Sequence, residues 1–343
     1  MTVEIREGFM KILLVGSADL SGKTVGGQLE KTRIFYQALC SVKYYDVHFI
    51  NMFAEKKSQI LLRIILRYFS SDAVVFLTSE NGTRLLINVL HILKKITYKP
   101  SIFVAVGNPN KVLQSVNKNL LNDIDIAFFE TERMAADMKK ILPGCTGCLT
   151  NCKSINTFYR NYHMDEKPIR ICYYSEISKR KGFDTVIQIL DRVNKEKKIY
   201  ELDVYGYFGD DKAEMETYLK RSYVSFKNMI KRGEAASVLS QYFVMLFLTR
   251  HPQEGVPGAV VDAFEAGLPV IANDISYMKD IVKDGETGYI LKAEDELEKK
   301  LLEMAQNMKP VIEMRQNCVK EARKYDISNA VNVFNQKMIE ICS

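Results

Sequence analysis

The chain has 343 residues, of which 47% are hydrophobic, and carries a formal net charge of +6 at pH 7. Because single domains commonly hold about 100–200 residues, this length predicts two domains, and the even spread of apolar residues excludes a disordered chain. The most apolar run, residues 60–66, is interrupted by Arg63 and is too short to span a bilayer, so we expect no transmembrane helix.

The cysteines and the first residues of the chain indicate its compartment. Seven cysteines are an odd number, which favours reduced thiols over a disulfide framework in a chain of this size. The N-terminal segment carries Glu4 and Glu7 where a secretion signal would need basic residues. We therefore expect a cytoplasmic protein, and its modest positive charge also permits a place at the inner face of the membrane.

Short β-rich apolar runs alternate with longer helical patterns from the start of the chain, which is typical of βαβ units and of a parallel sheet covered on both faces. The sequence therefore predicts the α/β class. In the first half, strands are predicted at residues 11–15, 45–50, 73–78, 102–107 and 124–129. The helices between and after them are predicted at residues 27–39, 58–69, 82–95 and 131–141.

A second sheet follows a segment without periodicity, residues 151–168, which we interpret as a linker. Its strands are predicted at residues 169–174, 202–207, 224–226, 243–248 and 269–273. A last helix at residues 327–341 has one apolar face. The expected domains are an acceptor-side domain at 1–155, a donor domain at 156–325, and a terminal helix at 326–343 that packs back on the first domain.

The most informative stretch runs from His251 to Asp274. After the predicted strand comes a loop and then Pro257, which suits the first position of a helix because its missing N–H would be unpaired there anyway. The N–H groups of residues 258–260 and the positive end of the helix dipole would form an anion site suited to a diphosphate. Glu254 before the helix and Asp262 about one turn inside it bracket this site.

This stretch resembles the motif of retaining GT-B glycosyltransferases, in which a Glu, seven residues and a second Glu precede a Gly-x-Pro-Val strand such as residues 267–270. The resemblance implies two Rossmann-like domains facing across a cleft, with Glu254 beside the donor sugar. Asp262 stands in place of the second Glu, which implies a contact with the ribose diol. The resemblance also implies donor-binding backbone at Gly255, Val256, Pro257 and Gly258.

A second match lies at residues 173–190, which resemble the strand, loop and Lys-Gly helix start of the same family. In that family an Arg and, five residues later, a Lys hold the donor diphosphate, which implies a catalytic role for Lys181. Glu176 occupies the place of the Arg and would repel a diphosphate unless Arg180 or Lys179 replaces the lost cation.

The glycine-rich N-terminal loop resembles the family's first loop, which implies that Gly26 and Gly27 lie by the donor. The first half is also similar to enzymes that build bacterial capsular and exopolysaccharides. Together these resemblances imply transfer with retention, a UDP-sugar donor, a glycan or lipid-linked acceptor, and no cofactor or essential metal. Because no basic–aromatic module occurs, we expect no nucleic-acid partner.

Two alternative functions stay open. Because Glu176 and Asp262 depart from the family pattern, the chain could be a degenerate scaffold or partner subunit. A nucleotide-sugar epimerase of the same fold is the second alternative. A P-loop NTPase is disfavoured, because five residues separate Gly16 from Gly22 where that motif, which would continue into Lys23–Thr24, needs four.

Two further patterns have a structural and a functional interpretation. Cys145, Cys148 and Cys152 could bind zinc with His163, but thiols packed in the sheet are the preferred interpretation. The predicted helices at 58–69 and 82–95 each carry a polar stripe on an apolar cylinder. Burial against the sheet is the default, and contact with an anionic membrane is the alternative. The two stripes consist of Gln59, Arg63 and Arg67, and of Arg84, Asn88, His91 and Lys95.

Overall fold

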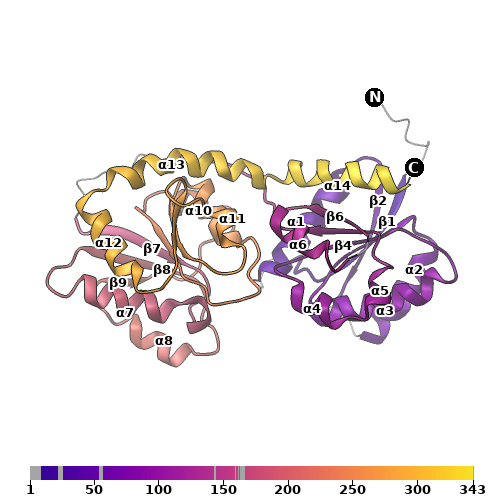
Figure 1. Cartoon of the computed structure of the whole chain (residues 1–343), viewed down its shortest axis with the longest axis horizontal. Helices are drawn as coiled ribbons and strands as arrows, with labels where there is room; N and C mark the ends of the chain where they lie inside the picture. The colour runs from indigo at the N-terminus through magenta and orange to yellow at the C-terminus, as the bar shows by residue number, and fades with distance from the viewer. Residues whose placement is uncertain are drawn as a thin grey trace. The chain divides into compact units, whose positions relative to one another are not determined.

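The computed structural model describes residues 9–21, 26–53, 57–142, 144–158, 160, 162 and 167–342. The described residues divide into two compact units, one up to Ser154 together with the chain from Asp326 onward, and one from Ile155 to Tyr325. Each unit contains a six-stranded sheet in which every paired strand runs parallel, with helices against both of its faces (Figure 1). The predicted α/β class with two doubly wound sheets is therefore confirmed.

The first unit has the strand order β2-β1-β3-β4-β5-β6. Its strands are β1 (Met10–Gly16), β2 (Tyr45–Asn51), β3 (Ala73–Leu77), β4 (Ser101–Val104), β5 (Ile126–Phe129) and β6 (Cys145–Cys148). Its helices are α1 (Gly27–Ser41), α2 (Lys57–Phe69), α3 (Glu80–Lys94), α4 (Asn110–Ser115), α5 (Lys118–Leu121), α6 (Glu132–Met138) and α14 (Ile327–Cys342).

The second unit has the strand order β12-β11-β10-β7-β8-β9. Its strands are β7 (Ile169–Tyr174), β8 (Tyr200–Tyr205), β9 (Val224–Phe226), β10 (Met245–Phe247), β11 (Val270–Asn273) and β12 (Gly288–Leu291). Its helices are η1 (Lys179–Lys181), α7 (Phe183–Val193), α8 (Lys212–Tyr218), α9 (Ala235–Leu239), α10 (Gly258–Glu265), α11 (Met278–Ile281), α12 (Glu296–Gln306), α13 (Lys309–Ala322) and η2 (Arg323–Tyr325). Two buried apolar clusters, one including α7 and one including α10, form its core.

The structure corrects two predicted strands. The strand predicted at 202–207 is β8, which ends at Tyr205 because the chain turns at Gly206, where φ is 152° and a Cβ would collide with the carbonyl oxygen of Ser175. The strand predicted at 102–107 ends at Val104, before the turn at Gly107, whose φ of 73° favours glycine.

The terminal helix α14 packs on the core of the first unit. Phe334 is fully buried, with its ring centroid 5.4 Å from that of Phe35 and 5.9 Å from that of Phe128. Ala330 and Met338, one helical turn away on either side, are buried in the same cluster. Among the described residues, no helix is both long enough and apolar enough to cross a bilayer.

Candidate active site

The candidate site lies where the neighbouring strands β7 and β10 end. These strands pair in parallel, so the loops that follow their carboxyl ends emerge side by side, which is where open α/β sheets bind ligands. The backbone at Gly182, just before α7, lies close to Leu248, just after β10. Only glycine allows this approach, because φ is 71° and a Cβ there would collide with the carbonyl oxygen of Leu248. The sequence thus places α7 directly beside the loop that carries Glu254.

Lys181 and Glu254 meet at this edge of the sheet. The Nζ atom of Lys181 lies 2.5 Å from Oε2 of Glu254, and each side chain is only 12% exposed. The hydroxyl of Thr249 donates to the same carboxylate oxygen at 2.9 Å. The two predicted catalytic residues, 73 positions apart in sequence, therefore form one ion pair shielded from water.

The loop after Glu254 leads into α10, which begins one residue later than predicted. Pro257 is the N-cap and not the first helical residue, because its ψ of 128° is extended. The N–H of Val260 donates to the carbonyl oxygen of Pro257 at 3.0 Å, so the prediction of an unpaired N–H there was wrong. The helix N-terminus has no side-chain cap, and Gly255 and Val256 are buried just before it. The positive end of the α10 dipole therefore still favours an anion near the start of this helix.

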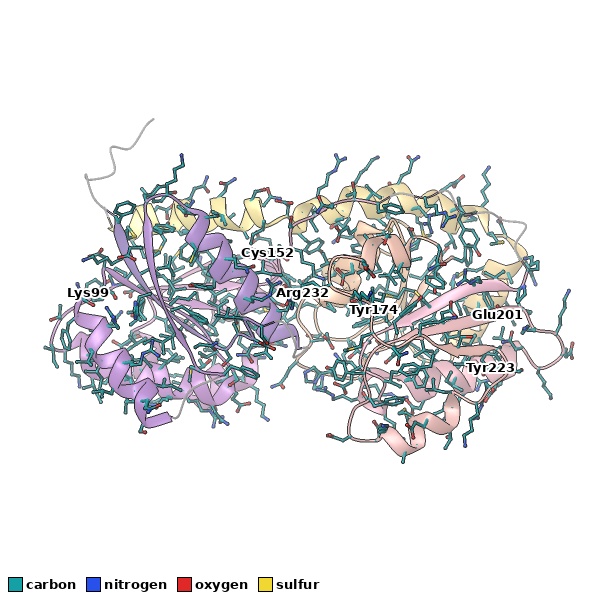
Figure 2. The ribbon with its side chains drawn as sticks, turned by 180° about the vertical axis from the view of Figure 1, so that it is seen from behind. Lys99, Cys152, Tyr174, Glu201, Tyr223 and Arg232 are labelled. Atoms are coloured by element: carbon teal, nitrogen blue, oxygen red, sulfur yellow. The ribbon has the colours of Figure 1, made fainter. Side chains whose placement is uncertain are left out.

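Asp262 lies on α10 and is buried, with 7% of its surface exposed. The hydroxyl of Tyr174, at the end of β7, donates to its Oδ2 at 3.3 Å, and Figure 2 labels this tyrosine in the second unit. The alternative of a plain surface acid is therefore excluded for Asp262. Its contact with a ribose stays a prediction.

Glu176, the residue in place of the family's Arg, is also held by other side chains. Its carboxylate accepts hydrogen bonds from Ser178 at 2.8 Å and from Arg180 at 2.7 Å. Burial alone would raise the pKa of Glu176, but these two bonds and the charge of Arg180 bring it below its ordinary value. Lys179 instead pairs with Glu214 at 2.7 Å. Arg180 is therefore the cation placed to offset Glu176.

Sequence reasoning missed Arg250, which fastens the loop after β10 to the start of α7. Its guanidinium donates to both carboxylate oxygens of Asp184 at 3.0 Å, to Glu294 at 2.8 and 2.9 Å, and to Thr185. Its backbone N–H donates to the carbonyl oxygen of Arg180 at 2.8 Å. No spacing in the sequence signals this cluster, because its members come from three separate segments.

We expect Arg250→Ala to lower the free energy of unfolding by about 1–3 kcal/mol, since it leaves Asp184 and Glu294 without their shared cation. Urea unfolding followed by circular dichroism would measure this loss. Arg192→Ala is the matched control, because Arg192 likewise links α7 to a glutamate, Glu298 of α12, in a more exposed setting. Equal losses in the two variants would contradict the role of Arg250 as a clamp.

Gly26 and Gly27 lie in the first unit, where Gly26 caps α1 and Gly27 begins it. A Cβ on Gly27 would meet no atom within 4 Å, so packing does not require glycine there. Their role beside a ligand stays a prediction. The P-loop candidate, Gly22 to Thr24, lies outside the described residues.

Of the three clustered cysteines, the structure buries Cys152, half-buries Cys148 and exposes Cys145, so the prediction of thiols packed in the sheet was wrong for Cys145. Cys145 and Cys148 are three residues apart on β6, so their side chains leave opposite faces of the sheet. Cys152, labelled in Figure 2, is fully buried, and burial raises the pKa of its thiol to about 11. Within the part of the chain that the structure describes, no three His, Cys, Asp or Glu residues gather as a metal site would require. His163 lies outside that part.

Comparison with known proteins identifies the second unit. Residues 155–325 match the family model described as glycosyl transferases group 1. The chain belongs to this glycosyltransferase family. The resemblance predicted from Glu254, Lys181 and the Gly-x-Pro-Val strand is thereby confirmed at the level of the family.

Curated relatives and solved structures that are similar to this chain extend the comparison. A UDP-N-acetylglucosamine–peptide N-acetylglucosaminyltransferase GtfA subunit of Streptococcus pneumoniae is 23% identical over 51% of this chain and 34% of its own length. An uncharacterised 41.2 kDa protein in the cps region of Klebsiella pneumoniae is 22% identical over 38% of this chain and 35% of its own. The matches thus span about a third of these curated relatives.

The structure of Anabaena HepE in complex with UDP-glucose has a TM-score of 0.72 with this chain at 14% identity. The alignment covers 96% of this chain and all of that one. At this identity the likeness shows the fold alone, and that fold is GT-B.

Proposed function

We propose that this glycosyltransferase moves a sugar from a UDP-sugar to a hydroxyl group of a glycan or lipid-linked acceptor, with retention of the anomeric configuration, in the synthesis of a bacterial surface polysaccharide. The observation that carries the proposal is the shielded Lys181–Glu254 pair beside the N-terminus of α10. It lies within the segment that matches the family model.

The chemistry of the site fits a departing diphosphate. When the bond between the anomeric carbon and the phosphate oxygen breaks, negative charge grows on the nucleotide diphosphate. Lys181 and the positive end of α10 would stabilise this charge, while Glu254 and the buried backbone after it would orient the sugar. The acceptor oxygen then bonds to the anomeric carbon from the side of the leaving group, and its proton leaves with the diphosphate.

The choice of UDP rests on the relatives. The HepE structure is a complex with UDP-glucose, and the name of the pneumococcal relative specifies a UDP-sugar. The proposed role in surface polysaccharide synthesis is supported by the name of the Klebsiella relative, which places it in a cps region. A peripheral contact with an anionic membrane would suit a lipid-linked acceptor.

A calorimetric screen of UDP-, GDP- and ADP-sugars against the wild type and Lys181→Ala tests the donor site. We expect one UDP-sugar to bind and to bind more weakly in the variant. Absence of binding by every donor would favour the degenerate scaffold. Product analysis without acceptor would separate an epimerase, because only an epimerase converts the donor sugar without one.

Arg180 should supply the second cation for the diphosphate. Its guanidinium is about half exposed and reaches back to Glu176 in the loop four residues earlier, so it can also contact an added phosphate. We expect Arg180→Ala to weaken UDP binding about 10-fold, the equivalent of one charge-assisted hydrogen bond. Glu176→Gln should strengthen it, because the variant removes a negative charge beside the phosphate site.

The matched control for Arg180 is Lys179→Ala, since Lys179 is the preceding cation but pairs with Glu214. Isothermal titration of UDP into all four proteins gives the comparison. If Lys179→Ala weakened UDP binding and Arg180→Ala did not, Lys179 would be the second cation and the prediction for Arg180 would be wrong.

A further inference from the structure

Helix α2 of the first unit exposes an apolar row that burial against the sheet does not explain. Ile60, Ile64 and Tyr68 face the core and are at most 2% exposed. Leu62 and Leu66, one turn apart, are 58% and 63% exposed. Because helical residues four apart share a face, these leucines form a row that points into solvent. Phe69, three residues further and 46% exposed, extends this row.

Helix α3 and the turn after it continue this apolar surface. Ile92 and Ile96 are 62% and 67% exposed, and Tyr98 is 63% exposed. The hydroxyl of Tyr68 on α2 donates to the carbonyl oxygen of Thr97 at 2.6 Å, which joins the ends of the two helices. Both helices cover the same face of the sheet, as Figure 1 shows. We call the six exposed residues Leu62, Leu66, Phe69, Ile92, Ile96 and Tyr98 the apolar ridge.

The two helices of the apolar ridge carry mainly cations. Two acids lie against α3, where Asp123 pairs with His91 at 2.7 Å and Asp125 pairs with Lys94 at 2.5 Å and accepts from the hydroxyl of Tyr98 at 2.9 Å. Residues 57–69 and 81–99 contain no Asp or Glu. Arg63 and Arg67 directly follow Leu62 and Leu66, Lys95 precedes Ile96, and Lys99 follows Tyr98. Figure 2 shows Lys99 at the rim of this unit. An apolar row flanked by cations on long stems is the pattern of a helix that lies in a membrane interface.

We propose that the apolar ridge docks the first unit on an anionic lipid bilayer. The ridge side chains would enter the boundary between headgroups and acyl chains, and Arg63, Arg67, Lys95 and Lys99 would contact the lipid phosphates. A protein partner fits less well, because protein interfaces are depleted of lysine. Each Lys or Arg near an anionic bilayer instead makes the free energy of binding more favourable by about 1 kcal/mol. The docking surface lies wholly in the first unit and does not depend on the donor chemistry.

Sedimentation of the full chain with lipid vesicles tests this docking. We expect binding to vesicles of phosphatidylcholine mixed with phosphatidylglycerol, little binding to phosphatidylcholine alone, and loss of binding at high salt. The triple variant Leu62→Gln, Leu66→Gln and Ile96→Gln should bind at least about 10-fold more weakly, because each lost side chain would bury apolar area in the bilayer. Leu302→Gln, at an exposed leucine of α12 in the second unit, is the matched control.

Three outcomes would overturn the docking surface. In the first, the wild type does not bind anionic vesicles. In the second, the triple variant binds them as strongly as the wild type. In the third, the wild type is a dimer, and the triple variant is a monomer that still binds vesicles. Titration of UDP into the same samples keeps the two proposals apart. Retained UDP binding without vesicle binding counts against the docking surface alone, and the reverse result counts against the donor site alone.

Discussion

Lys181→Ala should reduce the rate of sugar transfer by about 100- to 1,000-fold, the range found when one preorganised group that stabilises transition-state charge is removed. The ammonium group of Lys181 is held at 2.5 Å from Glu254 and is mostly shielded from water. In such a setting a cation acts strongly on a charge that grows nearby. Initial rates of UDP release with a saturating acceptor would measure the loss.

Loss of Lys181 also leaves the carboxylate of Glu254 without its cation, which costs about 3–5 kcal/mol where a pair is well buried. A lower rate could then reflect unfolding. The double variant Lys181→Met and Glu254→Gln removes both charges and should unfold at nearly the wild-type urea concentration while staying inactive. Near-wild-type transfer by this folded double variant would refute the catalytic role of the pair.

Glu254→Gln should lower the turnover number about 100-fold without weakening the binding of free UDP, since we place this side chain at the sugar and not at the nucleotide. The amide keeps the shape of the carboxylate and can still accept the hydrogen bond from Thr249, so the loop should stay in place. Steady-state kinetics and UDP titration on the same preparation would separate the two effects.

Glu286→Gln makes the same chemical change at an exposed position of the second unit and serves as the control for Glu254. It should leave both the turnover number and UDP binding unchanged. If Glu254→Gln weakened UDP binding as much as it lowered turnover, Glu254 would act on the nucleotide, and our assignment of this residue to the sugar would be wrong.

The sequence by itself predicted the fold class and the family. Short apolar runs alternate with helical patterns, which can be told apart because strands and helices differ in their hydrophobic period. This alternation predicts parallel sheets. The spacing from Glu254 to Asp262, with the later Gly-x-Pro-Val, was sufficient to predict the glycosyltransferase family. Lys181 was found in the same way, because its place before Gly182 is a local pattern. Features of this kind depend on neighbours in the chain and can be recognised without a structure.

The tertiary structure decided which side chains meet and which stay in water. The pairing of β7 with β10 brings Lys181 to Glu254, and Arg250 fastens the two loops through partners from distant segments. Glu176, expected to repel a diphosphate, is instead paired with Arg180. On α2, periodicity could not tell the buried Ile64 from the exposed leucines. Exposure and long-range contacts depend on how the elements pack, and no local pattern in the sequence encodes them.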